Sequence, residues 1–168
     1  MSEVKNKKKK SSIIQVSIGV LAVILAILII IMMGIVSDIQ GTARIVNYTG
    51  LVRGETQRLI KLELSTQQEN EMIHEIRTFI DGLRNGNDEL NLVRLADVDF
   101  QNKMQELDDK FSDLYKKIYL VRFKGVKNTD IIPESEEFFV ICDEATGLAE
   151  KYSQKKATSL SLLEKYIT

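Results

Sequence analysis

The sequence predicts an all-α protein in which an N-terminal transmembrane helix continues into an extracytoplasmic up-down-up-down bundle of four helices. The first observation is composition: nine glycines, one proline and no tryptophan in 168 residues suit helices better than strands, which need more turn residues. The second is an uncharged apolar run near the N-terminus. The third is the recurrence of apolar residues at three- and four-residue steps beyond that run, with short connections typical of antiparallel helices.

The first 36 residues predict a membrane anchor. Residues 1–12 hold five lysines, and residues 13–36 carry no charged side chain. This run exceeds the roughly 20 residues that a helix needs to cross the bilayer core. It is also longer than the apolar region of a cleaved signal peptide, and no convincing cleavage site follows it. By the positive-inside rule, residues 1–12 form a cytoplasmic tail near the lipid headgroups and residues 37–168 an extracytoplasmic domain. We expect a single-pass protein of a bacterial inner membrane.

Charge and rare residue types narrow the function. Residues 37–168 hold 18 basic and 23 acidic side chains, so a basic tail and an acidic body indicate membrane topology rather than nucleic-acid binding. His74 and Cys142 are the only residues of their types, which argues against disulfides and most metal or nucleophile sites. We interpret His74, with Glu71 and Glu75, as exposed helix surface and Cys142 as a buried, inert thiol. We expect no enzyme activity, no metal and no cofactor.

Four helices are expected, the first running from the membrane span to Leu64. Ser65 or Thr66 is expected to cap the second helix. The turn formers of residues 85–88 end this helix, with Gly86 in the left-handed region. The apolar face of the second helix comprises Met72, Ile76, Phe79, Ile80 and Leu83.

The third helix is expected from about Asp97 to Phe123, followed by a loop over residues 125–132. Pro133 then lies in the first turn of the fourth helix, where its missing N–H costs nothing. The third helix presents Phe100, Met104, Leu107, Phe111, Leu114 and Ile118 to the core. The fourth presents Phe138, Ile141, Cys142, Ala145, Leu148, Ala149 and Tyr152. An aromatic row on the third helix is interpreted as core or helix-face packing: Phe111, Tyr115, Tyr119 and Phe123.

Residues 47–64, NYTGLVRGETQRLIKLEL, contain glycines and arginines where a structural helix would prefer Leu, Ala and Glu. They contribute to a ladder of four- and three-residue steps, a coiled-coil-like seam that is polar in its middle: Ile39, Ala43, Val46, Gly50, Arg53, Gln57, Ile60 and Leu64. A neighbouring, nearly all-apolar ladder is expected to serve the core of the chain itself: Ile45, Tyr48, Val52, Leu59 and Leu62. The first ladder is therefore expected to face a second copy of the chain in a homodimer.

In a two-fold dimer, two Arg53 side chains would repel each other unless an anion lay between them. A guanidinium offers a planar fork of donors suited to a carboxylate or an oxyanion, Gly50 makes room, and Gln57 can donate one turn later. The alternative is that Arg53 lies on a solvated face or pairs with Glu55 or Glu63, and that Gly50 accommodates packing. The spacing is compatible with both interpretations.

The pattern Asn47-x-x-Gly50-x-x-Arg53, then Gln57-Arg58, with SEEFFVICDEATGLAEKYS at 135–153, resembles a known family. It is similar to the N-terminal sensor module of nitrate/nitrite sensor kinases and type IV pilus methyl-accepting chemotaxis transducers, in the version found before diguanylate cyclases and histidine kinases. The resemblance implies a dimeric four-helix bundle that senses a small ligand, with a motif arginine that contributes to anion binding at the dimer seam. The implied ligand-binding residues are Arg53, Gly50, Gln57 and Asn47.

Two functions from different classes follow. The first is a membrane-anchored ligand-sensing input module of a bacterial receptor, which binds a small ligand, an oxyanion among the candidates, and transmits a helix shift across the membrane. The second is a membrane-tethered helical adaptor that binds a protein partner and no small ligand. A polar seam around paired Arg53 side chains favours the first function, whereas an exposed apolar patch on the second or third helix would favour the second.

Overall fold

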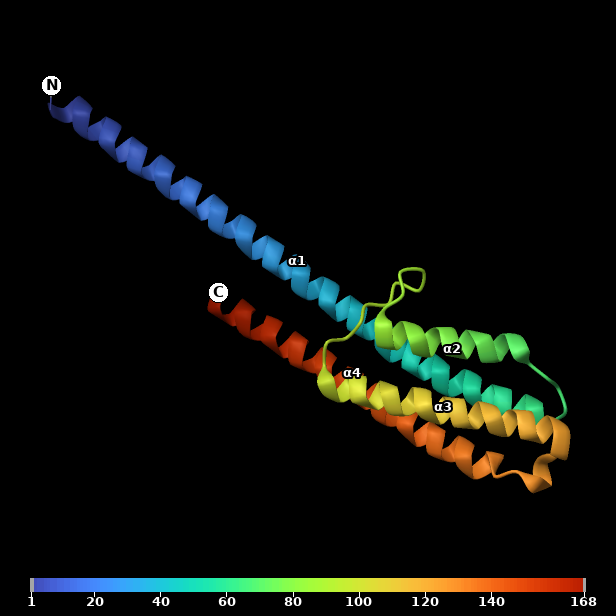
Figure 1. Cartoon of the computed structure of the whole chain (residues 1–168). Helices are drawn as coiled ribbons and strands as arrows, with labels where there is room; N and C mark the ends of the chain where they lie inside the picture. The colour runs from blue at the N-terminus through green and yellow to red at the C-terminus, as the bar shows by residue number, and fades with distance from the viewer. Residues whose placement is uncertain (1, 168) are drawn as a thin grey trace. The chain divides into compact units, whose positions relative to one another are not determined.

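The computed structural model describes the backbone of residues 2–167 and, apart from positions 38, 128 and 160, the side chains of residues 14–162. Its elements are α1 (Ser2–Leu64), α2 (Asn70–Asn85), α3 (Val98–Lys124), a short 3-10 helix η1 (Val126–Asn128) and α4 (Ile131–Ile167) (Figure 1). Over the described residues there is no strand, only an isolated bridge between Asn87 and Leu92. The all-α prediction is confirmed.

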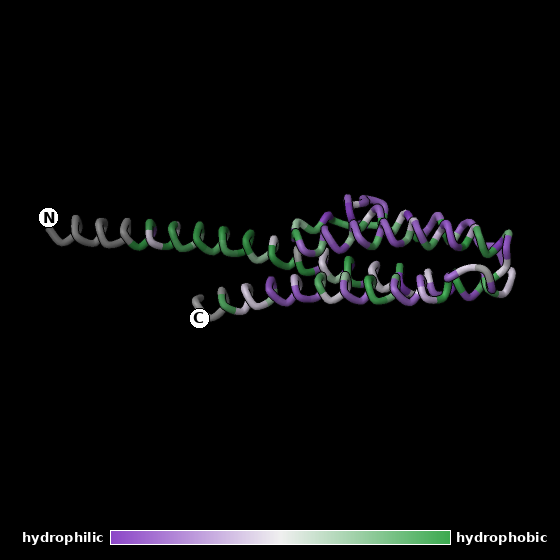
Figure 2. Tube along the Cα trace, turned by 60° about the horizontal axis from the view of Figure 1, so that its bottom comes forward, coloured by the Kyte–Doolittle hydropathy of each residue, from purple (hydrophilic) through white to green (hydrophobic). Residues whose placement is uncertain are grey.

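The chain divides into two compact units, Met1–Asp38 and Ile39–Thr168. In the first unit, the side chains from Ile14 onward are mostly exposed, and the most apolar 18-residue window has a mean hydropathy of 3.2. Figure 2 shows most of this run as a hydrophobic stretch of α1. Among the described residues, α1 is the one helix that is long and apolar enough to cross a membrane.

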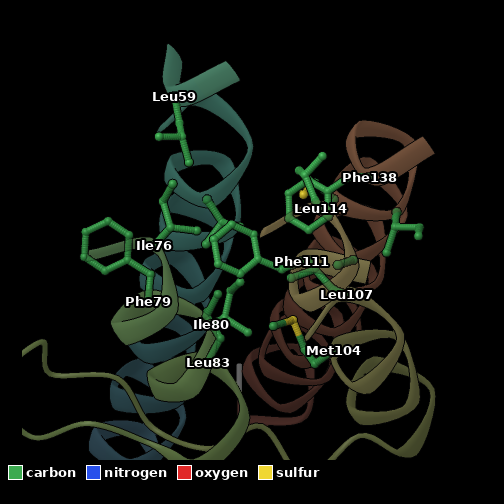
Figure 3. Close-up of a cluster of buried hydrophobic side chains, with 14 of the residues drawn as sticks. Leu59, Ile76, Phe79, Ile80, Leu83, Met104, Leu107, Phe111, Leu114 and Phe138 are labelled. Atoms are coloured by element: carbon green, nitrogen blue, oxygen red, sulfur yellow. The ribbon is translucent and has the colours of Figure 1, made fainter. Parts of the chain in front are cut away.

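The second unit is a four-helix bundle in which α2, α3 and α4 lie beside the C-terminal part of α1 (Figure 1). Every core residue predicted for α2 and α3 is buried, because each helix turns its apolar stripe inward. Figure 3 shows several of these side chains between the helices, together with Phe138 of α4. The ring centres of Phe111 and Phe138 are 5.8 Å apart. Burying each large apolar side chain contributes about 1.5–3 kcal/mol.

Most predicted helix ends are confirmed. Asp97 caps α3, its side chain accepting a hydrogen bond from the amide of Phe100 at 3.0 Å. Gly86, with a φ of 88°, ends α2, and Gly125, with a φ of 76°, ends α3. Pro133 lies in the first turn of α4, which begins at Ile131.

The predicted cap of the second helix is wrong. Residues Ser65 and Thr66 close α1 instead, because the amide of Ser65 donates to the carbonyl of Leu62 at 2.9 Å and Thr66 adopts a φ of 64°. The chain therefore turns before α2 begins, and Glu69 occupies the cap position without a side-chain hydrogen bond.

The connection between α2 and α3 packs onto α1. Asn87 and Leu92 exchange two backbone hydrogen bonds of 2.8 Å, which fold the loop back on itself. Val93 then approaches α1 so closely that a Cβ added at Gly41 would lie 2.8 Å from its Cγ2. Glycine at position 41 thus permits the close contact between loop and helix.

Candidate ligand-binding seam on α1 and α4

Arg53 of α1 reaches α4 in a polar contact that the sequence did not predict. Its guanidinium forms an ion pair with Asp143 of α4, and its Cζ stands 5.1 Å from the centre of the Phe139 ring. The side chains of Arg53 and Asp143 are 41% and 47% exposed. An aromatic face and a carboxylate thus hold the cation in place while one side of it stays open to solvent.

The helix surface next to Arg53 is open. A Cβ added at Gly50 or Gly54 would meet no atom within 4 Å, and the same holds for Gly147 on α4. The alternative that Gly50 accommodates packing inside the bundle is therefore wrong. Gly50 and Gly54 therefore leave open space on α1 near the accessible Arg53 side chain.

Asn47 and Gln57, the other two predicted site residues, line different hollows. Asn47 borders a surface hollow of about 630 Å³ together with Ala43 and Arg44. Gln57 borders a cleft of about 400 Å³ between the end of α1 and the start of α4. Ten residues of helix separate them by about 15 Å, so within one copy of the chain they do not share a hollow.

The ladder predicted to face a second copy is only partly exposed. Ala43 and Gln57 are exposed, whereas Val46 and Leu64 are partly buried against the core. Ile60 is 5% exposed and belongs to the core of its own chain, so its assignment to the seam is wrong. The second ladder behaves as predicted, with three members fully buried: Ile45, Val52 and Leu59.

Neither acidic partner considered for Arg53 is the one observed. Glu55 lies 3.7 Å from Arg58, three residues along the same helix. Glu63 is not on a solvated face at all, because it is 3% exposed and paired with Arg122 of α3. Sequence analysis did not predict the contact with Asp143, because it depends on the register of α4 relative to α1, which decides which α4 residue lies opposite Arg53.

Glu63 and Arg122 form a buried cross-link near the end of α1. The Nε of Arg122 donates to Glu63 at 2.9 Å, a second nitrogen donates to the other carboxylate oxygen, and a third donates to Asn70 of α2 at 2.8 Å. The backbone amide of Glu69 also donates to Glu63, at 3.2 Å. The buried carboxylate raises the pKa of the Arg122 guanidinium, and the contact joins three helices.

Polar residues at seven-residue intervals form part of the core face of α1, and sequence reasoning missed them. Thr42, Thr49, Thr56 and Glu63 are all at most 3% exposed. The Thr49 hydroxyl donates to the carbonyl of Ile45 at 2.8 Å, whereas the Thr56 hydroxyl has no hydrogen-bond partner among the described residues. The strict heptad spacing beside the apolar ladder was the signal that could have identified them.

The aromatic row of α3 leaves the core at its C-terminal end. Phe111 is fully buried, as predicted. The ring centres of Tyr115 and Tyr119 are 5.7 Å apart and those of Tyr119 and Phe123 are 5.8 Å apart, so the predicted packing along the helix face is confirmed. Tyr119 and Phe123 are nevertheless 46% and 79% exposed. With Tyr115, Lys116 and Leu120 they line a surface hollow of about 440 Å³. We call these five residues the α3 patch. Residues 115–127 hold five basic side chains and no acidic one.

The rare residue types occupy ordinary positions. Burial raises the pKa of the Cys142 thiol to about 12, with a smaller contribution from Asp143, so the thiol is protonated at neutral pH. His74, Glu71 and Glu75 are exposed on α2, as predicted. Among the described residues, no group of three or more His, Cys, Asp or Glu side chains could hold a metal ion.

One solved structure shares the fold of this chain. It is the ligand binding domain of the nitrate receptor McpN from P. aeruginosa, with a TM-score of 0.58 and 14% sequence identity, over 66% of this chain and 96% of that domain. No protein-family profile matches the sequence, and no curated protein matches it. The likeness shows that the two chains share a four-helix fold.

Proposed function

We propose that this chain is the membrane-anchored ligand-sensing input module of a bacterial signal-transduction receptor. In this proposal residues 1–12 are a cytoplasmic tail, residues 13–36 cross the inner membrane, and residues 37–168 sense the ligand outside. The fold shared with a chemoreceptor ligand binding domain and the membrane-competent α1 support the assignment. The observation that carries it is the Arg53 guanidinium, accessible over Phe139 beside the open surface at Gly50.

The ligand proposed for this seam is a small anion held between two copies of the chain. Two-fold symmetry would bring the same surface of α1 from each copy together, and open glycine positions allow two helices to approach closely. Each Arg53 would then offer its donor fork to the shared anion, with Asn47 and Gln57 one to two turns away along the helix.

Asp143 gives the proposed site a way to signal. An anion that binds Arg53 competes with the Asp143 carboxylate, and this carboxylate belongs to α4. When the anion replaces Asp143 as the partner of Arg53, the ion pair between α1 and α4 is lost. The ligand then favours the relative position of the two helices that it contacts better, which is the only way in which binding can shift such an equilibrium.

Thermal unfolding of the full chain in detergent micelles tests this function. Nitrate, sulfate and acetate serve as probes of oxyanion and carboxylate geometry. A bound anion is expected to raise the unfolding midpoint by about 5 °C at roughly 100 times its Kd. Arg53→Ala is expected to abolish the shift, whereas Arg58→Ala, which removes an exposed arginine of the same helix, preserves it. A shift that survives in Arg53→Ala would remove Arg53 from the site.

The α3 patch favours a second candidate function, an adaptor that binds a protein partner. Its exposed aromatic side chains, Tyr119 and Phe123, form an apolar surface that suits the apolar face of a protein partner. A photo-crosslinking residue at Phe123 in living cells is expected to trap one defined protein, and the same probe at exposed His74 is not. Equal labelling from both positions would contradict this candidate.

A further inference from the structure

We propose that the cleft between the end of α1 and the start of α4 binds a small aliphatic α-amino acid in its zwitterionic form. This inference deepens the proposed sensing function and rests on it. It shares Gln57 with the proposed seam at Arg53, and its other side chains are different. Residues of both helices line the cleft: Gln57, Ile60, Lys61, Leu64, Ser65, Ile132, Ser135 and Glu136.

The cleft presents two rows of side chains. On α1, Gln57 and Lys61 are four residues apart and so lie on one side of the helix. On α4, Ser135 and Glu136 lie one turn beyond Ile132. The volume of about 400 Å³ falls within the range of small-molecule sites and is large enough for an amino acid of five or six carbons.

Opposite charges stand on the two rows. Lys61 of α1 and Glu136 of α4 are both exposed, and neither side chain makes an ion pair or hydrogen bond with the other described residues. A simple anion would be attracted by Lys61 but repelled by Glu136. A simple cation would be attracted by Glu136 but repelled by Lys61. A zwitterion is the one small ligand that satisfies both charges at once.

The neutral polar groups match the same ligand. The hydroxyl of Ser65 donates to the Lys61 carbonyl at 2.9 Å, and that of Ser135 donates to the Ile132 carbonyl at 2.7 Å. Each hydroxyl oxygen thereby keeps its lone pairs for an incoming donor, such as an ammonium. Gln57 and Lys61 supply donors for a carboxylate. The cleft thus offers acceptors for one end of an amino acid and donors for the other.

The apolar side chains of the cleft favour an amino acid with an aliphatic side chain. Ile60 is buried, Leu64 is partly buried, and Ile132 is 52% exposed. An aliphatic side chain of the ligand would cover Ile132 and remove apolar surface from water, which a polar side chain would not do. Because the ligand bridges α1 and α4, its binding would act on the same pair of helices as the proposed signalling movement.

Isothermal titration calorimetry of the full chain in detergent micelles tests the ligand class. L-Leucine is the probe, with two analogues that each lack one charge: 4-methylpentanoate has no ammonium and 3-methylbutylamine has no carboxylate. Saturable binding of L-leucine is expected, with an affinity at least about tenfold higher than that of either analogue, because charge-assisted hydrogen bonds are lost in each. Equal affinity for leucine and 4-methylpentanoate would overturn the proposal.

Variants test the residues. Glu136→Gln and Lys61→Met are each expected to raise the Kd for L-leucine by about ten- to a hundredfold. Glu150→Gln and Lys151→Met make the same changes at exposed positions of α4 outside the cleft and are expected to leave the Kd unchanged. No binding of L-leucine to the unaltered chain, or binding that both cleft variants retain, would overturn the proposal.

The two proposals fail separately. An oxyanion response that depends on Arg53, without leucine binding, would leave the sensing function standing and overturn the amino-acid site. Leucine binding that is lost in Glu136→Gln and kept in Arg53→Ala would support this site. Absence of both responses would overturn both proposals.

Discussion

Two arginine–carboxylate pairs join helices of the same bundle, and they differ in almost every physical respect. Arg122 and Glu63 are buried, with side chains 9% and 1% exposed, and further hydrogen bonds satisfy their polar atoms. Arg53 and Asp143 are nearly half exposed, and the surface beside them is free of side chains at Gly50. Both contacts are arginine–acid ion pairs that tie α1 to another helix.

The difference shows which pair is able to change partners. A buried pair cannot separate without leaving an uncompensated charge away from water, so Arg122 and Glu63 fix the end of α1 against α2 and α3. An exposed pair contributes little to stability because water competes for both charges. In the proposed function, Arg53 would therefore exchange Asp143 for another anion at low cost.

The largest predicted effect is the loss of the buried pair. Arg122→Ala leaves the Glu63 carboxylate buried and unpaired, and we expect the free energy of unfolding to fall by about 3–5 kcal/mol. Urea denaturation of the full chain in detergent micelles measures it. The double variant Glu63→Leu with Arg122→Met removes both charges and is expected to recover most of the loss. A loss below about 1 kcal/mol in the single variant would show that the pair is not buried in solution.

Removal of the competing carboxylate should strengthen ligand binding at the exposed pair. Asp143→Asn keeps the shape of the side chain but takes a negative charge away from Arg53, and we expect the affinity for an oxyanion to rise about tenfold. Glu144→Gln is the matched control, since it removes the same charge one position further along α4. Equal changes in both variants would mean that only net charge matters.

The titration of Cys142 measures how well the core is buried next to the exposed Arg53–Asp143 pair. Its pKa is raised to about 12 by burial, whereas an unfolded thiol titrates near 8.5, so the unfolded chain loses its proton first as the pH rises. Stability is retained below about pH 8 and falls toward pH 12. Between about pH 8 and about pH 10 the unaltered chain should lose about 2 kcal/mol more than Cys142→Ala. Parallel pH profiles in urea denaturation would contradict a buried thiol.

The smallest effect is on stability at the exposed pair itself. Arg53→Ala is expected to change the free energy of unfolding by less than about 1 kcal/mol, and high salt should remove even that difference through screening. The same urea assay at about 0.05 M and about 1 M NaCl measures it. A large, salt-independent loss would make Arg53 a structural residue like Arg122.

The fold was predictable because the decisive signals are local. Apolar steps of three and four residues place Phe100, Met104 and Leu107 on one face of α3 whatever lies opposite, and Asp97 caps the helix through its own neighbours. The heptad of buried threonines on α1 escaped prediction because threonine is counted as polar, although its methyl group packs well in a core.

The candidate site was less predictable because its contacts are tertiary. Arg53 was identified from its spacing, but its pairing with Asp143 depends on the register of α1 against α4, which loops and core packing set together. For the same reason the sequence did not reveal that Glu63 is buried or that Phe123 is exposed, since both results depend on where a neighbouring helix ends.

Disulfide crosslinking in membranes tests most directly the central claim, that two copies of the chain meet on the glycine-containing face of α1. Ala43 and Arg44 are adjacent and both exposed, but Ala43 lies on that face and Arg44 is turned about 100° away. Under mild oxidation, Ala43→Cys is expected to form symmetric dimers, and nitrate is expected to change their yield, while Arg44→Cys stays largely monomeric. Equal crosslinking at both positions, or none at position 43, would contradict the account.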